Sequence, residues 1–360
     1  MSWDNVLDVK NIKIWTDYSD STQGHLFVND NHQLKLNVGI SFTLDTGETE
    51  GPTEDEVHSA LSLINNQDSG PLKYLSIVEA GRYTSVYDPN HVSIDPQNDI
   101  DDGIYDFVFT YYVSSPSNLN AETHSESVAL RVEYPQTNTD GTTTVVVKET
   151  SAKGNYYTKT CVNIICYSKK LYGKSGQHRI NLKMGTTDLA STDYHIILSN
   201  YNHEEDSLEV QWLYIDDSYF KIYYLEGGQE PDTDPNPGKD TDRLVYPYFI
   251  SCNKASTMWD YIKNSHFPNI KCGEFDYTVQ ISVTNTINPD HYWPIFRANV
   301  IVHQKENQVS FIHAYTKAEH LNYNEPTSSR VYLNIYDQFG NSAYVVITSE
   351  SKSSDVLSVS

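Results

Sequence analysis

The side chains of this 360-residue chain that are best suited to metal chemistry lie in two acid-rich stretches. Six carboxylate and amide side chains could supply ligands: Asp99, Asp101, Asp102, Asp232, Asp234 and Asn236. Calcium takes about six to eight oxygen ligands from flexible loops, and carboxylates at alternate positions can provide them. The second stretch begins like an EF-hand loop, but Gly238 comes one position late and Arg243 stands where a bidentate Glu is needed. We interpret both stretches as solvated loops, with a calcium site as the alternative.

A cluster of rings in the segment INPDHYWPIF suits ligand binding. His291, Tyr292 and Trp293 lie between two prolines, in a segment that should be a loop. Planar rings held on a rigid loop can stack on a sugar or insert into a protein partner. We predict a ligand-binding site there, and the alternative is that Trp293 closes the end of a core. Trp15 lies in a strand pattern and is expected in a core.

The motifs of common enzyme classes are missing from the sequence. It contains no GxSxG, HExxH, CxxC or glycine-rich phosphate loop. His203 and Glu204 begin HEEDS, which lacks the second histidine of a zinc protease. The thirteen histidines are scattered without ligand spacing. We therefore expect a protein that is not an enzyme and needs no cofactor other than the calcium considered above.

The chain is strongly acidic, with 48 Asp and Glu against 25 Lys and Arg and a formal charge of −23. Such a polyanion repels nucleic acids, so we expect no nucleic-acid partner. No apolar run approaches the roughly 18 residues that span a bilayer, so we expect no transmembrane segment. The N-terminal residues lack the basic and apolar regions of a signal peptide. We expect a secreted or cell-surface protein exported without a visible signal peptide, and a cytoplasmic location stays open.

The four cysteines are too few for a disulfide scaffold. Cys161 and Cys166 would lie on opposite faces of one strand, which makes them poor partners. Cys252 and Cys272 could bridge a loop that holds TMWDYIKN, a segment expected to be helical. We interpret all four as buried thiols, with the second pair as a possible disulfide.

The segment HQLKLNVGISFTLDTG, residues 32–47, predicts one long strand. Apolar side chains occupy every second position from Leu34 to Leu44, and polar residues and glycine fill the gaps. The alternation predicts one face in a core and one face in water. A membrane-inserting hairpin of a pore-forming toxin is an alternative, although large apolar side chains fit a permanent core better.

One helix and two hairpin turns complete the local predictions. Thr53 and Glu56 have the spacing of a capping box, and apolar residues follow at helical spacing, so we expect a short helix near 53–64. Residues 216–218 and 337–341 are expected to be hairpin turns. The polar segment 135–144 is either a linker or a hairpin loop.

Many strands of similar length with one helix indicate an all-β protein built from tandem antiparallel β-sandwich units of immunoglobulin-like type. We expect sandwiches at 1–135, with the helix, at 140–226 and at 245–360. The alternative is two larger domains, 1–150 and 151–360, with 226–244 as a long loop. The segment SRVYLNIYDQFGNSAYVVI, residues 329–347, resembles the closing strand, turn and strand of bacterial immunoglobulin-like modules. The resemblance covers these residues alone and identifies no family.

These observations favour a bacterial or viral binding or adhesion protein that recognises a carbohydrate or protein surface through loops at the ends of its sandwiches. The tyrosine content, 28 residues, is typical of proteins that bind through their surface. One alternative is a secreted toxin or virulence component that acts on host membranes. Another is a structural part of a phage tail or appendage.

Overall fold

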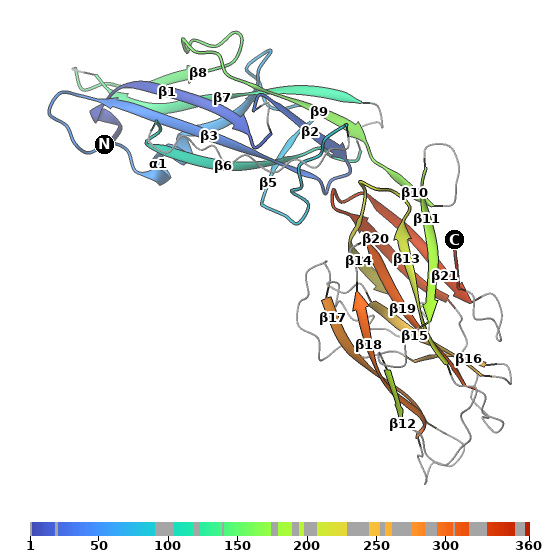
Figure 1. Ribbon diagram of the computed structural model, residues 1–360. Coiled ribbons are helices and arrows are strands. Elements are labelled where there is room, and N and C mark those ends of the chain that lie inside the picture. The colour runs from blue at the N-terminus through green and yellow to red at the C-terminus, as the bar shows by residue number, and fades with distance from the viewer. Residues whose placement is uncertain are drawn as a thin grey trace. The chain divides into compact units, whose positions relative to one another are not determined.

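The computed structural model shows an all-β chain made of two compact units (Figure 1). It describes residues 2–18, 21–90, 104–118, 123–138, 140–173, 179–188, 194–197, 207–228, 245–252, 256–260, 275–284, 294–304, 307–316, 330–349 and 357–360. Unit 1 comprises Met1–Lys169 and Phe339–Asn341, and unit 2 comprises Lys170–Gln338 and Ser342–Ser360. The three-sandwich and two-sandwich divisions of the chain stay predictions.

Unit 1 is built from strands with two short helical segments. Its elements are η1 (Ser2–Asn5), β1 (Val6–Thr16), β2 (Gln23–Val28), β3 (Gln33–Leu44), α1 (Glu54–Ala60), β4 (Leu61–Asn65), β5 (Ser76–Val78), β6 (Phe107–Ser114), β7 (His124–Thr137), β8 (Thr143–Glu149) and β9 (Val162–Ser168).

Two sheets of unit 1 enclose one hydrophobic core (Figure 1). Sheet A has the order β1-β3-β6-β5, and sheet B has the order β2-β9-β7-β4, with β8 also paired to β7. Leu36 and Ile40 of β3 meet Leu130 of β7 and Ile164 of β9 in the shared core. Two sheets packed face to face fit a β-sandwich.

Strand β3 confirms the strand predicted from alternation. Leu34, Leu36, Val38 and Ile40 are buried in the core. β3 pairs antiparallel with β1 on one side and with β6 on the other, which makes it a central strand of sheet A.

Helix α1 begins as predicted but ends early. The side chain of Thr53 accepts the backbone N–H of Glu56, and the Glu56 carboxylate accepts the Thr53 N–H at 2.8 Å. The prediction of a helix as far as residue 64 is wrong, because the chain enters β4 at Leu61. Leu61 and Leu63 alternate into the core opposite Val132 and Leu130 of β7, and this strand pairing overrides the helical spacing.

The segment 135–144 is a hairpin loop and not a linker. β7 and β8 pair up to Thr137 opposite Thr143. Gly141 adopts a φ of 81°, which favours glycine, and the Asp140 carboxylate accepts the Thr142 N–H at 2.9 Å.

Unit 2 consists of strands in the described ranges. They are β10 (Leu171–Gly173), β11 (Arg179–Asp188), β12 (Tyr194–Ile197), β13 (Ser207–Ile215), β14 (Ile222–Gly228), β15 (Val245–Cys252), β16 (Ser256–Asp260), β17 (Phe275–Thr284), β18 (Pro294–Gln304), β19 (Gln308–Thr316), β20 (Arg330–Asp337), β21 (Ser342–Ser349) and β22 (Leu357–Val359). They form three sheets with the orders β10-β11-β13-β19-β15-β16, β12-β18-β17 and β14-β20-β21-β22.

The structure corrects two further predictions and confirms a third. Residues 216–218 are not a hairpin turn, because β13 pairs with β11 and β19 whereas β14 pairs with β20. The segment TMWD of TMWDYIKN is not helical, because it lies in β16 and pairs with β15. The hairpin turn at 337–341 is confirmed between β20 and β21, with Gly340 at a φ of 73°.

Cys161 and Cys166 are free thiols, and Cys166 lies in the core of unit 1. Cys272 lies outside the described residues, so the disulfide alternative stays a prediction. Across the described ranges, no helix has the length and apolar character needed to cross a membrane.

His32 lies at the centre of an aromatic cluster in unit 1, between the rings of Phe27 and Phe339. Its Nδ1 accepts the Phe27 N–H at 3.1 Å, and its Nε2 donates to the Ser85 carbonyl at 2.9 Å. These two bonds require the neutral ring. Burial of the side chain, which is 1% exposed, lowers the pKa of His32 to about 4.

We predict that acid destabilises unit 1 through His32. Between pH 6.5 and 4 the His32 side chain takes up a proton in the unfolded chain but not in the folded one. The contribution of His32 to the free energy of unfolding is therefore complete above pH 6.5 and is lost as the pH falls toward 4. The loss is about 3 kcal/mol in the free energy of unfolding. Urea unfolding across this pH range measures it. The His32→Gln variant, whose amide can make both bonds without titrating, should show a flatter profile, and identical profiles would contradict the assignment.

Candidate functional site

The site residues predicted from the sequence lie outside the described residues. These are His291, Tyr292, Trp293, Asp99, Asp101, Asp102, Asp232, Asp234 and Asn236. The aromatic binding loop and the calcium site therefore stay predictions. Within the described ranges, no group of three or more His, Cys, Asp and Glu side chains could hold a metal ion.

The outer face of sheet A, which carries the polar residues of β3, is more buried than predicted. This face was expected in water, yet Asn37 is 2% exposed and Ser41 is 3% exposed. Gly39, between them, is also buried. The Tyr105 ring covers Gly39, Asn37 is bonded to Asp17 and Thr110, and the Ser41 hydroxyl accepts a bond from Asn11.

The ring of Tyr105 lies flat on Gly39. A methyl group built on Gly39 would meet the Cγ, Cδ2 and Cδ1 atoms of Tyr105 at 2.6, 2.7 and 2.8 Å. Three ring atoms at nearly equal distances mean that one face of the ring is turned to the sheet. Tyr105 itself is half-buried. We name this ring and its glycine floor the Tyr105 platform.

The indole of Trp15 is stacked with the ring of the Tyr105 platform. It is buried, as expected, but it points to the outer face of sheet A, whereas its neighbour Ile14 points into the core. Its ring centroid lies 5.7 Å from that of Tyr105, with 22° between the planes. Lys13 shares this face with Trp15, and its Nζ atom lies 5.6 Å from the indole centroid.

A hydrogen-bonded network fixes the sheet beside the platform. Asp17 accepts a bond from the Asn37 amide at 2.7 Å and forms an ion pair with Lys35 at 3.0 Å. Thr110 donates to the Asn37 carbonyl oxygen at 3.3 Å. The buried amide of Asn37 therefore has partners at both of its ends, as buried polar groups require.

Asp106 holds the backbone of Tyr105 in place. Its N–H donates to the Ile40 carbonyl at 3.0 Å, and its carboxylate accepts the Phe42 N–H at 2.7 Å. These bonds extend the pairing of β3 and β6 beyond Phe107. Gly39 therefore belongs to regular sheet, and Tyr105 lies two residues before β6 in a segment that Asp106 bonds to β3.

The outer face of sheet A is better suited to binding than to reaction. A half-buried ring beside the exposed residues Lys13 and Thr110 is a combination suited to stacking and polar contacts. The carboxylates of Asp17 and Asp106 are already engaged by other groups of the fold.

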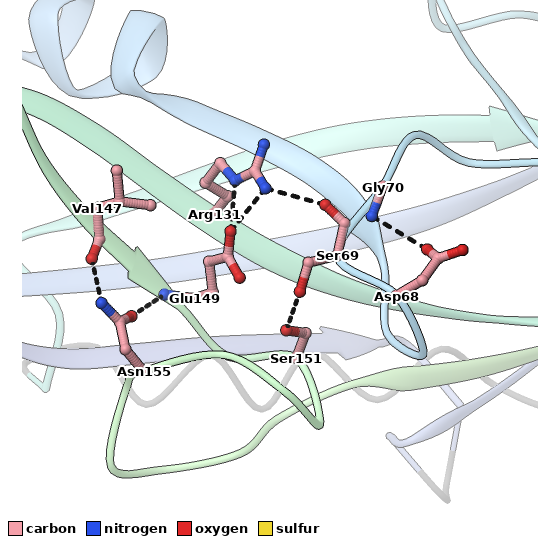
Figure 2. Close-up of polar contacts among 8 residues, drawn as sticks. All are labelled: Asp68, Ser69, Gly70, Arg131, Val147, Glu149, Ser151 and Asn155. Carbon is pink, nitrogen blue, oxygen red and sulfur yellow. Dashed lines mark hydrogen bonds and ion pairs between the residues drawn. The ribbon is translucent and has the colours of Figure 1, made fainter.

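A cluster on sheet B resembles an active site but is structural (Figure 2). Arg131 donates through Nε to the Glu149 carboxylate at 2.7 Å and through Nη2 to the Ser69 carbonyl at 2.9 Å. The hydroxyls of Ser69 and Ser151 share a bond of 2.7 Å, and Asn155 receives the Glu149 N–H. Figure 2 shows these groups directed at one another, so they join β7, β8 and the adjoining loops.

A second cluster, at one end of the core of unit 1, also lacks an activated nucleophile. The Ser115 hydroxyl lies 3.4 Å from His124 Nε2, but Ser115 is fully buried. Burial raises the pKa of Cys166 to about 11, so its thiol is protonated at neutral pH. Nearby, the buried carboxylate of Glu126 accepts the backbone N–H groups of Lys73 and Tyr74, which ties the chain to the core.

No protein-family model and no curated protein matches the chain. Function is therefore inferred from the outer face of sheet A. Sequence reasoning missed Tyr105 and Gly39, although a glycine inside an otherwise regular strand is a recognised sign of close approach by another group. The spacing of Lys13 and Trp15, which puts both on one face, was a second available sign.

We predict that Gly39→Ala displaces the Tyr105 ring. The added methyl overpacks the contact and should cost about 1–3 kcal/mol in the free energy of unfolding. In a Tyr105→Ala background the same change should cost little, because the space is empty and Ala suits a strand better than Gly. Urea unfolding of wild type, the two single variants and the double variant gives the coupling free energy between Gly39 and Tyr105. An equal loss of stability from Gly39→Ala in both backgrounds would contradict the platform.

We also predict that Arg131→Met costs about 1–3 kcal/mol in the free energy of unfolding, because it leaves the Glu149 carboxylate without its charged partner. Lys148→Met is the matched control. Its partner Asp8 is exposed, so that ion pair should contribute less than about 1 kcal/mol. Equal losses in the two variants would show that the cluster in Figure 2 is no stronger than a surface ion pair.

Proposed function

We propose that this protein is a non-enzymatic binding protein that recognises a carbohydrate on the outer face of sheet A. The Tyr105 platform is the observation that carries the proposal. A pyranose ring presents C–H groups on its flat side and hydroxyls around its rim. We expect the half-buried ring of Tyr105 to contact the flat side and the exposed residues Lys13 and Thr110 to meet the rim.

The rigidity of the platform supports this proposal. A weak ligand such as a sugar gains affinity when its site is ordered before binding, because less entropy is then lost. The Asp106 carboxylate ties the segment next to Tyr105 to β3, and Gly39 lets the ring approach the sheet closely. An adhesion protein with several such sites would gain further through avidity.

The sandwich units are proposed to be immunoglobulin-like and to act at the surface of, or outside, a bacterial cell. The core shared by the two sheets of unit 1 supports this class. The packing of β3 favours a binding protein over a pore-forming toxin. Leu36, Val38 and Ile40 would have to leave the core before this strand could meet lipid.

A glycan array probed with the full-length chain tests the proposal. Wild type should bind a set of glycans, and Tyr105→Ala should weaken binding about tenfold or more, the equivalent of roughly 1.4 kcal/mol. Tyr344→Ala is the matched control, since Tyr344 is 64% exposed and belongs to β21 of unit 2. Circular dichroism checks that each variant is folded.

Two results would contradict the proposal. One is a wild-type chain that binds no glycan on the array. The other is a folded Tyr105→Ala variant that keeps the full set of ligands, which would place any binding site elsewhere on the chain.

A further inference from the structure

We infer that the outer edge of β8, the side turned away from β7, is a self-association site. A second copy of this chain adds its own β8 there as an antiparallel strand. The inference does not depend on the carbohydrate site, because it rests on backbone groups that this edge leaves open.

The backbone groups of β8 that point away from β7 belong to alternate residues. Pro135 has no N–H and is the register partner of Val145, so these two residues form a non-hydrogen-bonded pair of the ladder. By alternation, the residues whose N–H and C=O groups point away from β7 are Thr143, Val145, Val147 and Glu149.

The fold covers one end of the outer edge and leaves the other end open. Asn155, in the loop after β8, donates to the Val147 carbonyl at 2.6 Å and accepts the Glu149 N–H at 3.0 Å (Figure 2). The backbone groups of Thr143 and Val145 and the N–H of Val147 have no hydrogen-bond partner within the part of the chain that the structure describes. The Val145 residue is 61% exposed, so this end of the edge is accessible to another strand.

The edge strand of sheet A, β1, is protected in a way that β8 is not. The Lys10 carbonyl of β1 accepts the Tyr156 hydroxyl at 2.9 Å, and the Val6 carbonyl accepts the Gln136 amide at 3.2 Å. Charged side chains, prolines and bulges are other common protections of a sheet edge. Residues 141–147 read GTTTVVV, without a charge or a proline, and β8 pairs with β7 without a register shift. A regular, uncharged edge rich in β-branched residues is suited to pairing with another strand.

A second β8 matches the open groups of this edge. When it runs antiparallel with Val145 opposite Val145 of the second copy, Thr143 of each chain lies opposite Val147 of the other. Every open N–H and C=O group then has a partner, because a carbonyl such as that of Val147 can accept two bonds. The same register places Lys148 opposite the uncharged Thr142.

Neighbouring registers fit less well. A shift in one direction would place Val147 opposite Gly141, which has a φ of 81° and belongs to the turn. A shift in the other direction would place Thr143 opposite Glu149, whose N–H and C=O groups are already bonded by Asn155 and Tyr156.

The charge of the chain also favours this edge as the contact. Two copies with a net charge of −23 repel each other. The uncharged residues 141–147 form a segment where that repulsion is weakest, and salt screens the charges that lie farther away.

Sedimentation velocity of the full-length chain tests the inference. A contact along one strand is a small interface, so we expect a weak dimer with a dissociation constant between about 1 µM and 1 mM. About 0.5 M sodium chloride shortens the Debye length to about 4 Å and limits the repulsion. Val145→Pro should weaken the association about tenfold or more, because it removes an outward N–H that the fold itself does not use.

Two control variants separate the edge from general stickiness. Val145→Thr keeps the N–H and a β-branched side chain, so it should associate as wild type does. Ile77→Thr changes an exposed apolar residue of another edge strand, β5, and should leave the association unchanged. Circular dichroism checks that each variant is folded.

Disulfide cross-linking tests the register without the proline variant. Opposed residues of a hydrogen-bonded antiparallel pair have Cα atoms about 5.5 Å apart, a spacing that a disulfide spans. Under mild oxidation Val145→Cys should give covalent dimers beyond any that the native cysteines of wild type form. Thr143→Cys and Val147→Cys should cross-link when the two variants are mixed, and much less when each is alone.

Two results would overturn the inference. One is a wild-type chain that stays monomeric throughout the concentration range, and binding of an unrelated extended peptide by that monomer would assign the edge to a different partner. The other is a dimer that Val145→Pro leaves unchanged and Val145→Cys does not cross-link, which would place the interface elsewhere. The glycan array tests the carbohydrate site separately, so either proposal can fail without the other.

Discussion

Unit 1 depends on a central strand, β3, that is covered on both faces. Hydrogen bonding to β1 and β6 fixes its register, and that register decides which side chains face each way. Its apolar residues complete the core, and on its other face Gly39 supports the ring of Tyr105. A shift of one residue would exchange the two faces and put Asn37 and Ser41 into the core. Because burying these polar side chains there is unfavourable, the register is strongly specified.

The rest of unit 1 provides hydrogen-bond partners for buried polar groups and for the backbone of an edge strand. Glu126 binds two backbone N–H groups at the end of the core, and Arg131 joins two strands to a loop. β1 is an edge strand of sheet A, and the hydroxyl of Tyr156 donates to its Lys10 carbonyl at 2.9 Å. This bond engages one backbone carbonyl of the edge strand, a group that would otherwise be open to pairing with another strand.

Local sequence patterns predicted individual strands and the start of the helix better than they predicted which segments pair or pack together. Alternation predicted β3 and its core face, and a capping box predicted where α1 begins. The end of α1, the missing hairpin at 216–218 and the covered face of β3 all depend on segments distant in sequence, which no local pattern records. For the candidate site, the glycine within β3 was visible from sequence, but its partner Tyr105 was not. The aromatic loop around Trp293 stays untested because it lies outside the described residues.

The central claim is that Tyr105 lies face-on over Gly39, and the proton chemical shift of the Gly39 Hα atoms tests it most directly. A full-length chain with ¹³C-labelled glycine gives this signal, and its loss in Gly39→Ala assigns it. Because a ring face shields nearby protons, the account predicts Hα shifts well upfield of ordinary strand glycines, returning to ordinary values in Tyr105→Leu. Ordinary shifts in the wild-type chain, unchanged by Tyr105→Leu, would contradict the platform and the binding site built on it.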